Sequence, residues 1–370
     1  MTERLKIGFD AKRIVRNGTG LGSYGRTLVN DLASYPLELR LYAPDQGRDQ
    51  LRQQIVQQEN VSFCYPAPSH LPFSKDLWRS KGIVSDLKRD GIQVFHGLSG
   101  ELPIGIRQSG IKSVVTIHDL IFLRHPEFYH WIDTKIYAWK FRQTIREADH
   151  IIAISACTKR DIMEYGEVDE SRISLIYQSC APRFEPQLST LHSPLSTRYI
   201  LSVGSIEARK NILLAVKALP HLPEEVKLVI VGRHTPYTDE VCAYAKKEGL
   251  SHRIRIMHGV SDEELPKLYA EAEAFVYPSR YEGFGIPIIE AISCGLPVVA
   301  CTGSCLEEAG GPDSLYVDPD DAQAMAHAIR QVLRGAEGRE KRIENSQQYI
   351  KRFAGNDVAG QVAELYRQLL

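Results

Sequence analysis

Two glutamates, Glu282 and Glu290, carry the strongest chemical signal in this sequence of 370 residues. They lie in one segment, in which the apolar, strand-like run 274–277 is followed by a glycine-rich loop and then by the start of a helix. Pro287 suits a first helical position, so we expect Glu290 in the first turn of that helix. Glycine amides and helix N-termini bind anions, and carboxylates bind sugar hydroxyls. The segment therefore predicts a site for a sugar joined to a diphosphate.

A basic pair, Arg209 and Lys210, follows the strand-like run 198–203 and precedes a helical pattern that starts near Asn211. A diphosphate carries negative charge that must be neutralised when its bond to the sugar breaks. Arginine offers a planar fork for phosphate oxygens, and lysine offers a point charge. A solvated pair at a loop would be the plain structural explanation. Because the glutamate segment is also present, we predict phosphate binding.

The N-terminal segment allows a second interpretation of the chain. Gly20-Leu21-Gly22-Ser23-Tyr24-Gly25 matches the G-x-G-x-x-G pattern of dinucleotide-binding folds, and Asp45 lies about where their ribose-binding acid would stand. That pattern should follow its strand directly, whereas residues 11–19 separate it from the expected first strand. An NAD-dependent oxidoreductase therefore stays open as an alternative, although it explains neither the two glutamates nor the basic pair.

Four segments together resemble glycosyltransferase family 4, a family of retaining enzymes with the GT-B fold. The segment with the two glutamates matches the family's E-x7-E signature. The other three are Ser205-Ile206-Glu207-Ala208-Arg209-Lys210-Asn211, similar to its second phosphate-binding segment, Gly18-Thr19-Gly20-Leu21-Gly22-Ser23-Tyr24, similar to its N-terminal glycine loop, and His118-Asp119, similar to its sugar-contacting histidine. Each segment alone is weak evidence, but their order and spacing agree along nearly the whole chain.

The resemblance implies roles for individual residues. Glu290 would accept hydrogen bonds from both ribose hydroxyls of the nucleotide. The group at the reacting sugar would be Glu282, His118, Arg209 and Lys210, with Glu282 against the hexose and His118 on its 6-hydroxyl. The other donor-binding positions that the resemblance implies are Gly20, Gly22, Gly204, Val260, Gly283, Phe284, Gly285 and Ile286. It also implies catalysis without a metal ion or other cofactor, and we expect no D-x-D metal motif at the site.

The composition indicates a globular enzyme, because 43% of the residues are hydrophobic and 25% are charged. A net charge of −1 gives no bulk attraction to nucleic acid, so we expect no nucleic-acid partner. No apolar run reaches the ~18–20 residues that span a bilayer, and the strand-like start at 5–9 leaves no room for a signal peptide. The seven cysteines lack C-x-x-C spacing, which indicates reduced thiols. We expect a cytoplasmic protein, with peripheral contact at the inner membrane face.

Strand-like and helical runs alternate along the chain, which predicts parallel sheets covered on both faces. Strands are expected at 5–10, 38–43, 60–64, 93–96, 112–117, 149–154, 198–203, 226–231, 253–258, 274–277 and 297–300. Helices are expected at 23–35, 131–148, 155–165, 211–219, 239–249, 262–272, 287–294 and 321–334. The fold class predicted is α/β, GT-B, with two facing Rossmann-like domains and a central crevice.

The proline-rich segment 182–196 is interpreted as the linker between the domains. Residues 1–185 would form the acceptor domain, onto which a C-terminal helix at 356–370 crosses back, and residues 195–352 would form the nucleotide-sugar donor domain. Asp10 and the segment 20–24 most resemble bacterial mannosyltransferases of surface polysaccharide assembly.

We therefore expect a retaining hexosyltransferase that moves mannose from GDP-mannose to a saccharide or lipid-linked saccharide acceptor. Three alternatives stay open. A transferase of the same fold could use a UDP-sugar, the chain could be the NAD-dependent oxidoreductase described above, or it could be a GT-B-like binding protein without catalytic activity.

Overall fold

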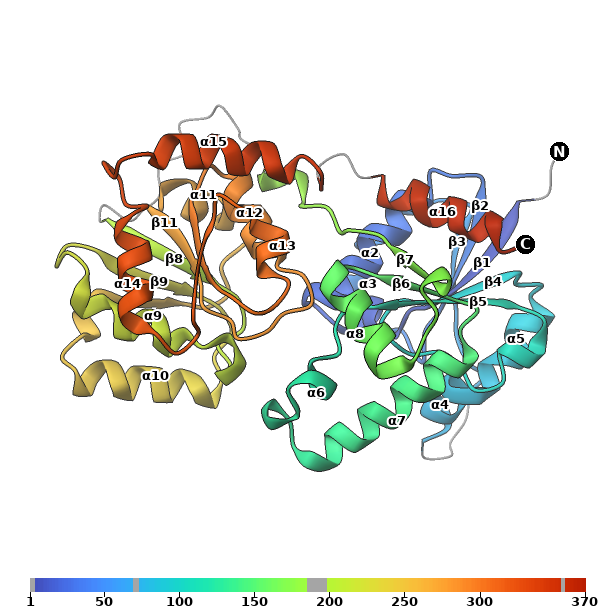
Figure 1. Cartoon of the computed structure of the whole chain (residues 1–370). Coiled ribbons are helices and arrows are strands. Elements are labelled where there is room, and N and C mark those ends of the chain that lie inside the picture. The colour runs from blue at the N-terminus through green and yellow to red at the C-terminus, as the bar shows by residue number, and fades with distance from the viewer. Residues whose placement is uncertain (1–3, 69–72, 185–197, 354–356) are drawn as a thin grey trace. The chain divides into compact units, whose positions relative to one another are not determined.

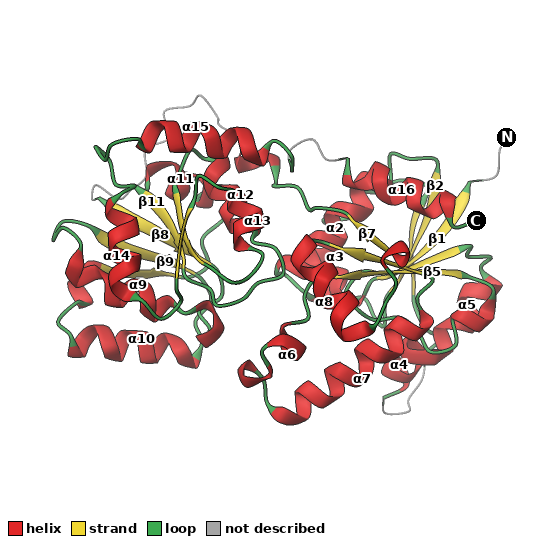
Figure 2. Ribbon diagram, in the orientation of Figure 1, coloured by secondary structure: helices red, strands yellow, loops and turns green. Residues whose placement is uncertain are grey.

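The computed structural model describes residues 4–68, 73–184, 198–353 and 357–370, and the chain divides into two compact units (Figure 1). The first unit comprises Met1–Tyr177 and Asp357–Leu370, and the second comprises Gln178–Asn356. Each unit is a parallel sheet with helices on both faces, which confirms the expected α/β fold class (Figure 2). Most of the expected linker lies outside the described residues, and its first part, Pro182–Phe184, forms a short 3-10 helix, η5.

The sheet of the first unit has seven parallel strands in the order β3-β2-β1-β4-β5-β6-β7 within the described residues. They are β1 (Leu5–Asp10), β2 (Leu37–Tyr42), β3 (Val61–Cys64), β4 (Val94–Gly97), β5 (Lys112–Ile117), β6 (His150–Ala153) and β7 (Ile173–Leu175). All except β7 lie close to expected runs. The expectation missed β7 because three residues at the edge of a sheet leave too short an apolar run to recognise.

The helices of the first unit cover both faces of this sheet. They are α1 (Lys12–Arg16), α2 (Gly20–Leu32), α3 (Asp49–Arg52), α4 (Ser74–Leu77), the π-helical turn η1 (Trp78–Gly82), α5 (Ile83–Arg89), η2 (Arg107–Ser109), α6 (Ile121–Arg124), η3 (Pro126–Phe128), α7 (Trp131–Glu147), α8 (Ala156–Gly166), η4 (Glu170–Arg172) and α16 (Val358–Gln368). One core contains side chains of α2 and α16, and the other contains side chains of α5, α7 and α8.

The last helix, α16, is part of the first unit although it is the final element of the chain. Its buried Tyr366 hydroxyl lies 2.6 Å from Nδ1 of His96, whose Nε2 lies 2.8 Å from the hydroxyl of Thr116. Burial lowers the pKa of His96 to about 3, so its ring is neutral near pH 7. His96 therefore joins α16 to the interior of the sheet as a structural residue.

The sheet of the second unit has six parallel strands in the order β10-β9-β8-β11-β12-β13 within the described residues. They are β8 (Tyr199–Val203), β9 (Lys227–Val231), β10 (Ile254–Met257), β11 (Ala274–Tyr277), β12 (Val298–Cys301) and β13 (Leu315–Val317). Five of these match expected runs. The short edge strand β13 was missed for the same reason as β7.

The helices of the second unit again lie on both faces of the sheet (Figure 1). They are η6 (Ala208–Lys210), α9 (Ile212–Ala218), η7 (Leu219–His221), α10 (Pro236–Lys247), η8 (Ser251–Arg253), α11 (Leu265–Glu271), α12 (Ile286–Ser293), α13 (Leu306–Gly310), α14 (Ala322–Arg330) and α15 (Arg339–Ile350). Side chains of α9, α10 and α14 share one core with the sheet. Helix α15 packs on α12 and α13.

In each sheet, the strand order reverses at one point, between β1 and β4 in the first unit and between β8 and β11 in the second. The connections that leave two such neighbouring strands run in opposite directions across the sheet, so their carboxyl ends are where open α/β sheets bind ligands. The segment after β8 contains the basic pair, and the segment after β11 contains Glu282. The topology alone therefore brings these two predicted motifs together.

The N-terminal glycines lie in a helix rather than in a loop, which corrects the expectation that the first helix starts near Tyr24. Helix α2 begins at Gly20, and Thr19 is its N-cap. A Cβ atom at Gly22 would stand 1.9 Å from the backbone oxygen of Asn17. Any side chain at Gly22 would therefore force the turn before α2 apart, so this glycine is required for local packing.

Candidate active site

The carboxylate of Glu282 is the centre of a compact charged cluster in the second unit. Lys210 Nζ donates to Glu282 Oε1 and to the hydroxyl of Tyr277, the latter at 2.9 Å. That hydroxyl in turn donates to Glu282 Oε1 at 3.2 Å, and Arg209 Nη1 lies 3.3 Å from Glu282 Oε2. Glu282 is 8% exposed. The structure therefore brings together three of the predicted site residues and adds Tyr277.

The charges of this cluster are fixed near pH 7. Burial by itself would raise the pKa of Glu282, but the positive charges of Lys210 and Arg209 outweigh it and lower the pKa. Burial by itself would lower the pKa of Lys210, but the Glu282 carboxylate raises it above its ordinary value. Burial, together with the charge of Glu282, raises the pKa of Tyr277 to about 12. Two cations thus flank the buried Glu282 carboxylate, and Arg209 Nε also lies 3.3 Å from Oε2 of the more exposed Glu207.

Backbone contacts hold the two halves of the cluster in place. The basic pair lies in the short helix η6, which ends at Asn211 in a left-handed conformation (φ 54°). The Asn211 side chain donates to the carbonyl of Pro319 at 2.8 Å. The amide of Arg280 donates to the carbonyl of Arg209 at 2.9 Å. The segment after β11 is thereby tied directly to the segment after β8.

The predicted glycine loop, 283–286, runs from this cluster into helix α12. Gly285 precedes the helix with φ 117°, a conformation that L-residues rarely adopt, so a glycine is needed there. The Phe284 ring is buried against Phe353, edge to face, with 5.3 Å between ring centroids. The thiol of Cys305 donates to the carbonyls of residues 282 and 284. Phe284 can therefore serve a ligand through its backbone, while its side chain belongs to the core.

Glu290 is the fifth residue of α12, which corrects its expected place in the first turn. The helix starts at Ile286 and has no acidic residue in its first turn. The half-buried Glu290 carboxylate accepts a hydrogen bond from Tyr269, a fully buried residue of α11, at 3.0 Å. Burial raises the pKa of Glu290 to about 7, although the Tyr269 hydroxyl opposes the shift. Glu290 therefore exchanges its proton close to neutral pH.

Two other predicted donor positions lie at carboxyl ends of strands in the same sheet. Gly204 directly follows β8 and lines a small cavity together with Ser205, Lys210 and Tyr277. Val260 is half-buried in the loop after β10. The whole donor set of the second unit thus follows β8, β10 and β11.

A literal D-x-D pattern is present at Asp318-Pro319-Asp320, contrary to the expectation that no such motif accompanies the site. It follows β13, and the carbonyl of its proline is the one that Asn211 binds. Asp320 pairs with Arg280 instead of standing open. Among the described residues, no group of three or more His, Cys, Asp or Glu side chains is arranged to hold a metal ion.

His118 follows β5 and lies in the first unit, together with Gly20 and Gly22. Its Nε2 donates to the carbonyl of Leu98 at 2.9 Å, and its own carbonyl accepts from the hydroxyl of Thr158 at 3.2 Å. The Tyr24 ring packs edge-on against the imidazole, with 4.8 Å between centroids. Burial lowers the pKa of His118 to about 4, so the ring is neutral near pH 7. A neutral imidazole suits hydrogen bonding to a hydroxyl better than pairing with a phosphate.

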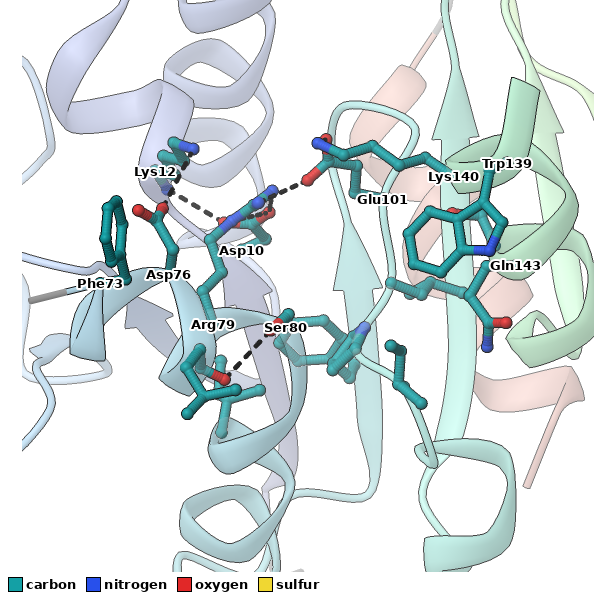
Figure 3. A pocket seen from close by; sticks show the side chains of 17 residues that line it. Asp10, Lys12, Phe73, Asp76, Arg79, Ser80, Glu101, Trp139, Lys140 and Gln143 are labelled. Atoms are coloured by element: carbon teal, nitrogen blue, oxygen red, sulfur yellow. Dashed lines mark hydrogen bonds and ion pairs between the residues drawn. The ribbon is translucent and has the colours of Figure 1, made fainter. Parts of the chain in front are cut away.

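A cavity of about 450 Å³ opens at the switch point of the first unit (Figure 3). Asp10 at the end of β1 and Glu101 after β4 both pair with Arg79 of η1, and Arg79 Nε lies 3.0 Å from Asp10 Oδ2. Lys140 Nζ lies 2.9 Å from Glu101 Oε1. Trp139 of α7 lies on the same wall as Lys140 (Figure 3). The cavity thus combines an aromatic wall with a chain of ion pairs.

These ion pairs leave polar atoms for a neutral, hydroxyl-rich ligand. Burial by itself would raise the pKa of Glu101, but the charges of Arg79 and Lys140 outweigh it and lower the pKa to about 2. Burial, with the nearby charge of Arg79, lowers the pKa of Lys12, which also lines the cavity. Each carboxylate oxygen can accept more than one hydrogen bond. Asp10 and Glu101 can therefore accept hydrogen bonds from a ligand while they remain in their ion pairs.

Several of these residues were missed in the sequence. Tyr277 and Tyr269 hold the two glutamates, and Arg79 and Glu101 build the cavity. Tyr277 had a usable signal, because it is the last residue of a buried strand and must lie at the carboxyl end of the sheet. Tyr269, Arg79 and Glu101 had no such signal, because the residues that they contact lie far away along the chain.

Family models match most of the chain. The model described as "Glycosyltransferase Family 4" matches residues 18–179, and the model described as "Glycosyl transferases group 1" matches residues 186–349. These matches identify a transferase and so overturn the NAD-dependent oxidoreductase alternative. Asp45, the residue on which that alternative relied, pairs with Arg16 and Lys75.

Known proteins of similar sequence and fold agree with the family models. An "O-antigen chain mannosyltransferase B" of Escherichia coli is 31% identical, with 99% of this chain and 100% of that protein covered. The sucrose-phosphate synthase of Thermosynechococcus elongatus has a similar fold, with a TM-score of 0.80 at 20% identity, and 99% of each chain is covered. The Anabaena protein Alr3699/HepE, solved in complex with UDP and glucose, has a TM-score of 0.74 at 18% identity over 99% of this chain and 100% of that one. The chain therefore belongs to glycosyltransferase family 4, as a hexosyltransferase of the GT-B fold.

Proposed function

We propose that the protein is a retaining hexosyltransferase that moves mannose from GDP-mannose to a saccharide acceptor, free or carried on a lipid. The observation that carries the proposal is the pair of cations, Arg209 and Lys210, held around the buried carboxylate of Glu282. This cluster lies at the switch point of the second sheet, where such folds bind ligands. The diphosphate of a nucleotide sugar would pair with the two cations, and the sugar hydroxyls would donate hydrogen bonds to the carboxylate.

The reaction follows from what each group can do. The bond between the sugar's anomeric carbon and the diphosphate oxygen breaks, and negative charge grows on that oxygen. Arg209 and Lys210 stabilise this charge because they are already oriented in a largely buried site. The acceptor oxygen bonds to the anomeric carbon on the face that the diphosphate leaves, and its proton passes to the departing diphosphate. Glu282 accepts hydroxyl hydrogen bonds from the hexose and takes no covalent bond.

Glu290 provides a second recognition element on the nucleotide side. Its carboxylate can accept hydrogen bonds from both hydroxyls of a ribose, and Tyr269 orients it. These hydrogen bonds from the ribose stay the same when the bond between the hexose and the diphosphate breaks. Glu290 therefore contributes to donor binding, whereas the cations contribute to the rate.

The choice of mannose rests on the similarity to the O-antigen chain mannosyltransferase B. A UDP-sugar is the second candidate donor, because the Anabaena protein of similar fold was solved with UDP and glucose. The cavity with Trp139 in the first unit is our candidate for the acceptor saccharide, because aromatic faces and paired carboxylates suit sugars.

Thermal unfolding in the presence of GDP-mannose, UDP-glucose, ADP-glucose and NAD tests the donor. A ligand that binds only the folded chain raises the melting temperature as its concentration exceeds the dissociation constant. We expect GDP-mannose to give the largest rise. A larger rise with UDP-glucose would favour the second donor, and no rise with any nucleotide sugar would overturn the proposal and favour an inactive binding protein.

Metal removal should leave the proposed reaction unchanged. The cluster already supplies positive charge through Arg209 and Lys210, so we expect the initial rate of mannosyl transfer to be the same with and without EDTA. The literal D-x-D at 318–320 makes the experiment informative. A rate that fell with EDTA and returned with Mg²⁺ or Mn²⁺ would contradict the prediction and point to that segment.

Donor affinity should depend on pH through Glu290, whose pKa is raised to about 7 by burial. Below this pH the carboxyl is protonated and accepts ribose hydrogen bonds poorly, so the affinity should fall as the pH decreases. The fall approaches tenfold for each pH unit below the pKa. Calorimetric titration with GDP-mannose at about pH 6 and about pH 8 measures it. Glu290→Gln should bind with little pH dependence, and an equal dependence in both proteins would contradict the assignment.

A further inference from the structure

Helix α7 carries a surface that the fold does not use. Among the described residues, Trp131 is 62% exposed, Trp139 is 57% exposed, and Ile132 and Ile136 are each 46% exposed. The opposite side of the helix packs on the sheet through buried residues that include Phe141 and Ile145. The helix is therefore apolar on two sides, and only one of them is covered within the first unit.

The exposed apolar side chains share their face with basic ones. At 3.6 residues per turn, the positions 131, 135, 139, 142 and 146 form one stripe, and Ile132 and Ile136 lie beside it. The stripe reads Trp, Lys, Trp, Arg, Arg, and all five side chains are exposed. Lys135 Nζ lies 4.9 Å from the centroid of the Trp131 ring. We call this set of seven residues the α7 face.

The seven positions of the α7 face hold no carboxylate. The exposed Asp133 lies at the edge of the face, one turn before Ile136, and Glu147 is buried, where it accepts hydrogen bonds from the amides of Gly105 and Arg107. Within the described part of the chain, the three cations Lys135, Arg142 and Arg146 make no ion pair. The α7 face thus has a charge of +3 in a protein whose net charge is −1.

We propose that the α7 face docks the protein on an anionic lipid surface. Tryptophan and isoleucine enter the boundary between headgroups and acyl chains, while lysine and arginine on the same face pair with anionic headgroups. Tryptophan in particular suits this boundary, since its ring is apolar and its N–H still finds a polar partner. The absence of acidic side chains from the α7 face within the described residues fits a uniformly anionic surface.

The position of Trp139 connects the α7 face with the acceptor cavity. Trp139 belongs to the face, and it also lines the cavity of the first unit together with its neighbours Lys140 and Gln143 (Figure 3). A saccharide carried on a lipid in the same bilayer would then be presented beside the cavity. This consequence rests on the proposed function, whereas the docking itself does not.

Sedimentation with lipid vesicles tests the docking without donor or acceptor. We expect the protein to bind vesicles of phosphatidylcholine with phosphatidylglycerol, to bind phosphatidylcholine alone much more weakly, and to dissociate as salt rises. Lys135→Glu/Arg142→Glu and, separately, Ile132→Ser/Ile136→Ser should each weaken binding about tenfold or more. The matched control is Lys81→Glu/Lys88→Glu, which changes the charge equally at two exposed lysines of η1 and α5.

The outcomes separate the docking from the proposed function. The variants Lys135→Glu/Arg142→Glu and Ile132→Ser/Ile136→Ser, which leave Trp139 in place, should keep the wild-type rate on a water-soluble saccharide acceptor and lose kcat/KM on an acceptor held in vesicles. Vesicle binding without any mannosyl transfer would count against the proposed function only. The docking proposal is overturned if the control variant loses as much binding as the charge variant, or if wild type ignores phosphatidylglycerol. It is also overturned if the wild-type chain is a dimer that Ile132→Ser/Ile136→Ser dissociates, since a second copy would then be the occupant.

Discussion

Lys210→Met should lower the kcat of hexosyl transfer about 100- to 1000-fold, while the dissociation constant for the donor changes much less. Lys210 Nζ donates to Glu282 Oε1 and to Tyr277, so it is fixed before the donor arrives. A preorganised charge contributes most when negative charge develops on the departing diphosphate, and less when the substrate is merely bound. Arg209→Ala should lower kcat in the same direction.

The same substitution should also destabilise the fold, which allows a sharper control. Lys210→Met leaves the buried Glu282 carboxylate with one cation fewer, at a cost of about 3 kcal/mol in the free energy of unfolding. Adding Glu282→Gln removes the uncompensated charge, so the double variant Lys210→Met/Glu282→Gln should regain most of that stability. Urea unfolding measures the recovery, and steady-state kinetics should find the double variant still inactive.

Lys246→Met serves as the matched substitution, because Lys246 is an exposed lysine of α10 on the same unit. It should leave both the rate and the stability unchanged. If Lys210→Met kept the wild-type kcat, or if restoring stability in the double variant also restored activity, the proposed role of the cation would be wrong.

Glu290→Ala should raise the dissociation constant for GDP-mannose about 10- to 100-fold, with a smaller change in kcat at saturating donor. The substitution removes an acceptor that can bind two ribose hydroxyls, and hydrogen bonds to a charged group are the stronger kind. Because the ribose does not change during the reaction, the loss should be the same in the ground state and in the transition state.

A ligand lacking one hydroxyl isolates this interaction. Wild type should bind GDP more tightly than 2′-deoxy-GDP, and Glu290→Ala should bind the two nearly equally, in calorimetric titrations at about pH 8, where Glu290 is ionised. Glu307 of α13 provides the control, since Glu307→Ala removes a carboxylate elsewhere in the same unit. A variant at position 290 that still preferred GDP by the wild-type factor would show that another residue binds the ribose.

Much of the fold could be predicted because its signals are local. Buried strands such as Lys227–Val231 are nearly continuous apolar runs, and helix α12 is bounded by Pro287 near its start and Gly295 after its end. The edge strands β7 and β13 were not predicted, because three residues are too few to show the hydrophobic pattern of a strand. The start of α2 was not predicted either, because glycines such as Gly20 and Gly22 are typical of loops. Their place in a helix depends on the neighbouring turn at Asn17.

The site could be predicted only as separate motifs. Arg209 and Glu282 belong to different segments, and their meeting depends on β8 pairing with β11, a sheet order that no local pattern contains. The contact of Tyr269 with Glu290 depends likewise on helix packing. For α7, the sequence predicts a helix at 131–148, yet only the folded unit tells which side of the helix stays exposed.

A crystal structure of the protein with GDP-mannose tests the central claim most directly. The diphosphate oxygens should lie within hydrogen-bonding distance of Arg209 and Lys210, the ribose on Glu290, and the mannose against Glu282. A donor bound elsewhere, with its diphosphate away from these two cations, would contradict the account.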